Sequence, residues 1–129
     1  MQEQDWVPGQ DLFIESFSPE SRYGVVFEDD GEAAYFYAVE KDREGMGVRV
    51  LDALHIHESA GDESTKPSPL KIVWSRDWLK CALVIDGYCH ALFDFEAHGG
   101  YNINEFPPPN DFWSKGDRKL SDELIQKLF

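Results

Sequence analysis

The chain has few basic residues, few cysteines and no long apolar run, and each shortage excludes a class of protein. Its 129 residues include 12 Lys and Arg against 25 Asp and Glu, which gives a net charge of −13. A field of that sign repels a phosphate backbone, so nucleic-acid binding is not expected. The longest apolar runs, such as Cys81–Ile85, are far too short to cross a bilayer, so no membrane association is expected. The first residues, MQEQD, lack the basic and apolar segments of a secretory signal, and the expected location is the cytoplasm.

Catalytic and cofactor motifs are also missing. No serine or cysteine has the surrounding pattern of a nucleophile elbow or a Cys–His dyad. No glycine-rich segment opens a helix with a basic residue, as a phosphate-binding loop does. We therefore assign no catalytic residue and no cofactor, and the sequence does not favour an enzymatic role.

The negative charge is unevenly distributed along the chain. Residues 1–63 contain 16 acidic and 4 basic residues, whereas residues 64–129 contain 9 acidic and 8 basic residues. Acidic surfaces commonly serve only to keep a protein soluble. The functional alternative is that the acidic half attracts a basic protein partner.

Short runs rich in Val, Phe and Tyr predict an antiparallel β structure. Residues 22–28 and 33–40 flank Asp30-Gly31, a pair typical of a type I′ hairpin turn. With these two turn residues, Phe27 lies opposite Ala34. One face of the hairpin is then apolar and suited to a core; it consists of Tyr23, Val25, Phe27, Ala34, Phe36 and Ala38.

A second hairpin is predicted over residues 79–96, with Asp86-Gly87 as its turn. One predicted face holds Leu79, Cys81, Leu83, Ile85, His90 and Leu92, and the other holds Ala82, Val84, Cys89, Ala91, Phe93 and Phe95. Because both faces are apolar, we expect both to be covered.

The same turn places the two cysteines on opposite faces. Cys89 is predicted opposite Val84, and Cys81 opposite Leu92. An intrachain disulfide is then geometrically excluded. Both cysteines are predicted to be buried free thiols, which fits a reducing compartment.

The C-terminal segment is expected to cover one face of this second hairpin. A helix is predicted over residues 120–129, with Ser121 as its N-cap. Its apolar stripe consists of Leu120, Leu124, Ile125 and Leu128. A proline-rich connector over residues 106–119 precedes the helix, and a β core over residues 11–105 precedes the connector.

The predicted fold class is mainly β. We expect an antiparallel meander sheet or a partly open barrel of about six to eight strands with one C-terminal helix. The whole chain, residues 1–129, is predicted to be a single domain.

Five residues form the predicted partner-binding set: Asp29, Asp30, Glu32, Tyr35 and Tyr37. The acids lie at the tip of the first hairpin, and the tyrosines lie on its second face, which is more apolar than a fully solvated face needs to be. The most favoured function is a protein-interaction module, either regulatory or resembling an immunity protein that occupies a basic partner. An exposed edge strand gives the alternative of a homodimer.

Three histidines form the alternative metal-binding set: His55, His57 and His90. His55 and His57 are two apart on a predicted strand over residues 48–58, so both side chains leave the same face, as in metal-binding β-barrels. The competing interpretation is that they cap the exposed face of an edge strand. A third function is a small-ligand carrier with a pocket between the sheet and the terminal helix.

Asp52 shares its strand parity with the inward-facing Val50 and Leu54. A buried carboxylate there would be a functional acid with a raised pKa. The favoured alternative is that a β-bulge rotates Asp52 outward or that it accepts backbone hydrogen bonds in a bend.

Several segments resemble a small bacterial family of unknown function. The resemblance covers roughly residues 20–107 and is carried by the stretches FEDDGE (27–32), YFYA (35–38), LDALHI (51–56), IVWS (72–75) and ALVIDGY (82–88). It implies a bacterial cytoplasmic protein, and it implies no activity, cofactor or catalytic residue.

Overall fold

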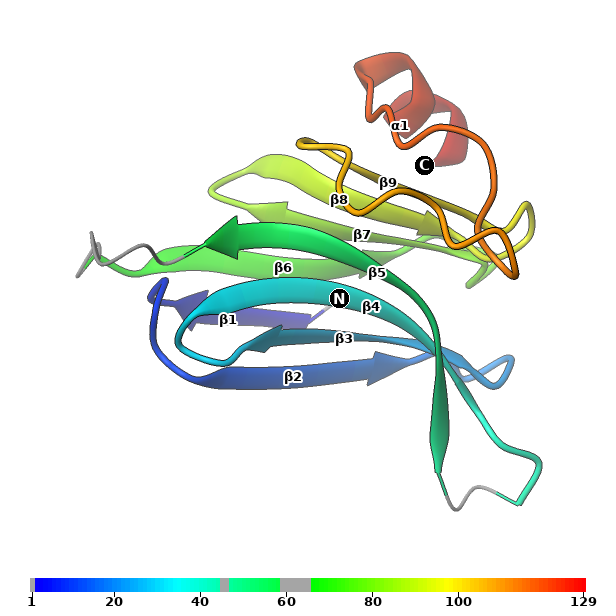
Figure 1. Ribbon diagram of the computed structural model, residues 1–129, viewed down its shortest axis with the longest axis horizontal. Helices are drawn as coiled ribbons and strands as arrows, with labels where there is room; N and C mark the ends of the chain where they lie inside the picture. Colours follow the sequence, from blue (N-terminus) through cyan, green and yellow to red (C-terminus); the bar gives the residue numbers. More distant parts are fainter. Residues whose placement is uncertain (1, 45–46, 59–65) are drawn as a thin grey trace.

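The computed structural model describes residues 2–44, 47–58 and 66–129, which form two antiparallel sheets and one C-terminal helix (Figure 1). One sheet has the strand order β1-β6-β7-β8-β9 and the other the order β2-β3-β4-β5. The strands are β1 (Gln2–Trp6), β2 (Leu12–Phe17), β3 (Tyr23–Asp29), β4 (Ala33–Lys41), β5 (Val48–Glu58), β6 (Ser68–Trp74), β7 (Lys80–Ile85), β8 (Tyr88–Asp94) and β9 (Gly99–Asn102), and the helix is α1 (Asp122–Leu128).

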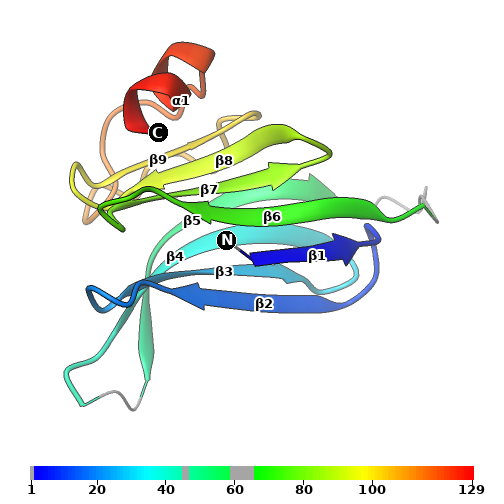
Figure 2. The same cartoon turned by 180° about the vertical axis from the view of Figure 1, so that it is seen from behind.

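The two sheets pack face to face around one core. The β2–β5 sheet lies in front of the other sheet in Figure 1 and behind it in Figure 2. Phe36 of one sheet stacks on Phe93 of the other with ring centroids 5.2 Å apart, and Trp6 meets Phe27 edge-on at 5.2 Å. The prediction of a mainly β, antiparallel fold with one terminal helix is confirmed. The strands form two stacked sheets, however, and not one meander sheet or a barrel.

The apolar face of the first hairpin is confirmed, but its register differs from the prediction. Phe27 pairs with Phe36 instead of Ala34, a shift of two residues. The turn is longer because Asp29 Oδ1 accepts from Gly31 N and Asp30 Oδ1 accepts from the N–H groups of the next two residues after Gly31. A shift of two residues keeps every side chain on its predicted face.

A β-bulge at His90 places the following β8 side chains on the face opposite to the predicted one. Val84 pairs with Cys89 as predicted, but Leu83 pairs with Ala91, so His90 has no partner across the ladder. One extra residue reverses the parity of everything beyond it. The side chains that share the core are therefore Cys81, Leu83, Ile85, Ala91, Phe93 and Phe95.

The two cysteines are free, as predicted, but only Cys81 is buried, whereas Cys89 is half-buried. Cys81 is fully buried in the core and pairs with Phe93, whereas the prediction placed it opposite Leu92. Burial raises the pKa of both thiols, to about 11 for Cys89. Neither thiol is a thiolate at neutral pH, so neither has the character of a nucleophile.

The terminal helix begins where the sequence predicts. Ser121 Oγ accepts a hydrogen bond from Leu124 N at 3.1 Å and caps α1. The predicted apolar stripe is half-buried while the rest of the helix is exposed, and Leu120 and Ile125 share a small pocket with Cys89. The helix lies beside β8 and β9 (Figure 1). No helix in the described part of the chain is long and apolar enough to span a membrane.

Candidate functional site

The outer face of the β2–β5 sheet brings aromatic and acidic side chains together. Strand pairing aligns them in rows across the sheet: Phe13, Glu28, Tyr35 and His55 form one row, Glu15, Val26, Tyr37 and Ala53 the next, and Phe17, Gly24, Val39 and Val50 the third. We call this surface, which consists of these three rows, the tyrosine face. It turns away from the core because most of its residues alternate with core residues along the strands.

Aromatic rings run along the centre of the tyrosine face. Tyr35 and Tyr37 stack with ring centroids 6.0 Å apart, and His55 meets Tyr35 edge-on at 5.2 Å. Phe13, at the edge of the same row, is 60% exposed. Partial burial and the negative charge of Glu28 raise the pKa of Tyr37, so its hydroxyl stays protonated and can donate. Half-exposed aromatic rings of this kind are enriched at protein interfaces.

Five acidic residues lie on or next to the tyrosine face: Glu15 and Glu28 belong to its rows, and Asp11, Asp30 and Glu32 lie next to its strands in the chain. No described cation forms an ion pair with any of the five. Glu40, at the other end of β4, differs because it pairs with Arg22 and Arg49. Backbone N–H donors lower the pKa of Asp30, which keeps this exposed carboxylate ionised.

A shallow pocket of about 300 Å³ lies at the acidic end of the tyrosine face. Its walls are the Phe13 ring, Leu12 and the carboxyl-bearing residues Asp11, Glu28 and Asp30, together with Asp29. Lysine and arginine side chains combine an apolar stem with a charged head. In this pocket Leu12 and Phe13 offer apolar surface for such a stem, and the carboxyl-bearing residues offer negative charge for such a head.

Asp29 is a structural residue, which corrects its place in the predicted partner-binding set. It is only 2% exposed. Its Oδ2 accepts hydrogen bonds from Trp6 Nε1 and Gly9 N, both at 2.9 Å, and its Oδ1 accepts from Gly31 N. Asp29 thus ties the β1–β2 connection to the β3–β4 turn. The other four members, Asp30, Glu32, Tyr35 and Tyr37, all remain at least partly accessible.

The structure separates the two histidines that were predicted to share a face. Tyr35 pairs with His55 and Ala34 with His57, so Ile56 is an extra residue that reverses the alternation. His55 consequently lies on the tyrosine face. His57 points toward the core side, where its ring meets Trp6 edge-on at 5.7 Å.

His90 and His55 line one pocket of about 230 Å³, together with Ile56, Ile103 and Asn104. Both ring nitrogens of His55 already have partners, since Nδ1 lies 2.7 Å from Asn104 Nδ2 and Nε2 lies 3.2 Å from Glu58 Oε1. Burial lowers the pKa of His90. Within the described ranges, no group of three His, Cys, Asp or Glu side chains is placed to hold a metal ion.

Asp52 is buried, and its role is to hold Arg118. A bulge at Leu51 precedes it, yet Asp52 remains 3% exposed, which corrects the expectation that a bulge turns it outward. Its two carboxylate oxygens accept from Arg118 Nη1 at 2.7 Å and Nη2 at 2.8 Å. Arg118 Nε also donates to Pro107 O at 2.6 Å. This ion pair fastens the C-terminal segment to β5, and it is not a free catalytic acid.

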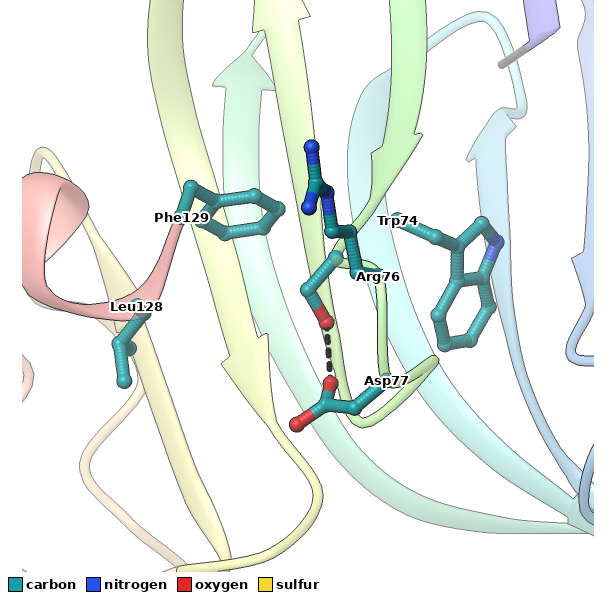
Figure 3. A pocket seen from close by; sticks show the side chains of 6 residues that line it. Trp74, Arg76, Asp77, Leu128 and Phe129 are labelled. Carbon is teal, nitrogen blue, oxygen red and sulfur yellow. Dashed lines mark hydrogen bonds between the residues drawn. The ribbon is translucent and has the colours of Figure 1, made fainter.

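A separate open pocket of about 370 Å³ lies between the β6–β7 turn and the end of α1 (Figure 3). In this view the Arg76 guanidinium lies between Trp74 and Phe129. Asp77 at the rim accepts hydrogen bonds from Ser75 Oγ and the Leu79 N–H, which lower its pKa to about 2. With this lowered pKa the Asp77 carboxyl group stays ionised at neutral pH and does not act as a proton donor.

Sequence reasoning missed Phe13, Glu15 and Glu28 as parts of the site. The alternation of Leu12, Ile14 and Ser16 with the three outer residues of β2 was the available clue.

Comparison with known proteins extends the sequence resemblance to most of the chain. Residues 6–129 match the model of a family described as an uncharacterised protein conserved in bacteria (DUF2251). An uncharacterised protein of Haemophilus influenzae is 34% identical over 96 residues, which is 72% of this chain and 58% of that protein. The match therefore spans little more than half of the Haemophilus protein. No solved structure matches the chain. The chain belongs to this family of uncharacterised bacterial proteins.

Proposed function

We propose that the chain is a protein-interaction module whose tyrosine face binds a positively charged protein. The observation that carries the proposal is the set of five acids around Tyr35 and Tyr37 that no described cation neutralises. Uncompensated surface charge of one sign accelerates and orients association with a partner of opposite sign. The exposed aromatic rings supply the apolar contact that charge alone does not give.

The acidic pocket beside Phe13 supports the same partner chemistry. It combines an aromatic wall with three exposed or half-exposed carboxyl-bearing residues. A lysine or arginine from the partner would place its stem on Phe13 and its charge among Asp11, Glu28 and Asp30. A partner anchored in this way loses affinity steeply as salt increases.

The test uses two variants with equal change in net charge. Glu28→Gln/Glu32→Gln removes two acids near the tyrosine face, and Glu20→Gln/Glu123→Gln removes two exposed acids elsewhere. Each protein is immobilised, exposed to lysate of the bacterium that encodes it, and eluted with increasing salt. We expect a protein of basic isoelectric point that the wild type and the Glu20/Glu123 control retain.

The Glu28/Glu32 variant should bind the isolated partner about tenfold more weakly or worse, as measured by titration calorimetry. Equal binding by both variants would place the contact elsewhere on the molecule. Binding that does not change with salt would remove the electrostatic basis of the proposal.

A further inference from the structure

The edge of β2 has backbone groups without a partner strand. β2 is the first strand of the β2–β5 sheet and forms the lower edge of the stacked strands in Figures 1 and 2. Ser18 N donates to Tyr23 O at 2.9 Å, which marks these two residues as a hydrogen-bonded pair. Because such pairs alternate along an antiparallel ladder, Leu12, Ile14 and Ser16 also bond to β3.

The N–H and C=O groups of Phe13, Glu15 and Phe17 therefore point away from β3, toward the open edge. No hydrogen bond from another segment of the described chain reaches these backbone groups. The side chains of the same three residues lie on the tyrosine face. An incoming strand would thus meet free backbone groups and the binding face at once.

Two of the other sheet edges are covered by the chain itself. At β5, His55 N donates to Phe106 O at 2.9 Å, and Asn110 Nδ2 donates to Leu51 O at 2.7 Å. At β9, Asn102 N donates to Arg118 O at 3.2 Å. Natural sheets cover or charge their edges to prevent unwanted pairing.

The edge of β1 is protected differently, because its exposed positions carry only polar and charged side chains, including Glu3 and Asp5. β2 combines an open backbone with Phe13 at 60% exposure and has neither a proline nor a bulge. It is the edge best suited to accept a strand.

We propose that β2 accepts an extended strand of the basic partner, which adds a fifth strand to the β2–β5 sheet. This inference rests on the proposed function and specifies how the partner is recognised. In antiparallel pairing, the partner residues opposite Phe13, Glu15 and Phe17 share the tyrosine face with them. Opposite-charge and apolar pairs stabilise such contacts, so the recognised strand has a lysine or arginine at its centre and β-branched or aromatic residues two positions to each side.

Charge argues against a second copy of the chain as the occupant. If two β2 strands pair with each other, residues that face the core must lie opposite residues that face the core. A symmetric antiparallel pairing is therefore centred on Glu15 or on a neighbouring residue. Centring on Glu15 sets two carboxylates side by side, and centring on Ile14 sets Glu15 opposite Phe13. Each copy also has a net charge of −13, which opposes their approach.

The test uses the synthetic peptide Thr-Val-Thr-Lys-Thr-Val-Thr and the same peptide with glutamate in place of lysine. Amide hydrogen exchange of the full chain is followed by NMR with and without each peptide. We expect the lysine peptide to slow exchange at Phe13, Glu15 and Phe17 by about threefold or more and the glutamate peptide to leave it unchanged. Unchanged exchange with saturating lysine peptide would overturn the proposal.

A matched pair of variants separates the backbone from the charge. Glu15→Gln and Glu15→Pro both remove the carboxylate, but only proline removes the N–H that faces the open edge. The glutamine variant should keep the peptide-induced protection at Phe13 and Phe17, and the proline variant should lose it. Equal protection in both variants would contradict strand addition. If the proline variant does not fold, the amide exchange of the wild-type protein with the lysine and glutamate peptides decides whether strand addition occurs.

The outcomes also distinguish this inference from the proposed function. Peptide-induced shifts confined to Tyr35 and Tyr37 would overturn strand addition while leaving a binding face in place. Protection of the β2 amides by the lysine peptide, with no basic protein retained from lysate, would support the strand site and remove the proposed cellular role.

Discussion

Asp52 and Arg118 form a buried ion pair in which every guanidinium N–H has an acceptor. Two N–H groups meet the Asp52 carboxylate, and the others donate to the carbonyl oxygens of Gly100, Pro107 and Pro108. Desolvating two charges is costly, and complete hydrogen bonding offsets that cost. Removing either partner leaves an unpaired charge in a place that water does not reach.

We predict that Asp52→Ala lowers the free energy of unfolding by about 3–5 kcal/mol. Arg118→Ala should have an effect of similar size, because it leaves the Asp52 carboxylate buried and alone. The effect of the double variant should be well below the sum of the two, since the second substitution removes the unpaired charge. Urea unfolding followed by tryptophan fluorescence measures all three. Additive effects would show that the two residues do not act as a pair.

The sequence could not reveal these residue-scale contacts. Asp52 stands out as an acid among inward-facing residues, but Arg118 is 66 positions away and nothing local connects the two. Asp29 was misplaced for the same reason, because its main partner Trp6 belongs to a strand in the other sheet. Burial of a polar side chain depends on distant segments, which a single sequence does not place.

β2 and β3 fit together closely at Gly24. A Cβ atom at this position would lie 2.3 Å from Cδ1 of Phe17, so the ring covers the glycine on the tyrosine face. The Phe17 ring is held from above by Lys41, whose Nζ lies 4.4 Å from the ring centroid. Gly24 is thus needed for close approach of a ring, and not for an unusual backbone conformation.

We predict that Gly24→Ala destabilises the protein by about 1–3 kcal/mol, because the ring or the strand must move. In a Phe17→Ala background the same substitution should cost much less, since the obstructing ring is gone. Thermal unfolding of the four proteins gives the coupling between the two sites. An equal cost in both backgrounds would contradict the packing of Phe17 on Gly24.

Where strand pairing is regular, the alternation of apolar and polar residues correctly predicted which side chains face the core. The core face of the first hairpin was found in this way, and the error in its register was even, so no side chain changed face. Bulges at Leu51, Ile56 and His90 each reverse the alternation, and predictions beyond them changed face. β1 was missed because its polar sequence QEQDW has one buried residue and gains its place by pairing with β6.

At the scale of the whole molecule, the uneven charge along the chain becomes a difference between the two sheets. The acidic residues 1–63 contain all four strands of the β2–β5 sheet, whereas β6–β9 and α1 come from the nearly neutral remainder. The part of the chain that forms the β2–β5 sheet therefore produces most of the negative field, although β1, with Glu3 and Asp5, belongs to the other sheet. Such a field acts over about a Debye length, roughly 10 Å at 0.1 M salt, and acts mainly on the rate of encounter.

The central claim is that the tyrosine face binds a basic protein, and the association rate constant tests it most directly. We would measure this rate by stopped flow with the captured partner between 20 and 500 mM salt, for the wild type, Glu28→Gln/Glu32→Gln and Glu20→Gln/Glu123→Gln. The rate should fall steeply with salt for the wild type and the Glu20/Glu123 control, and it should be slower and less salt-dependent for the Glu28/Glu32 variant. Identical rates and salt dependences for the two variants would contradict the claim, because the acids beside Tyr35 and Tyr37 would then have no special part in recognition.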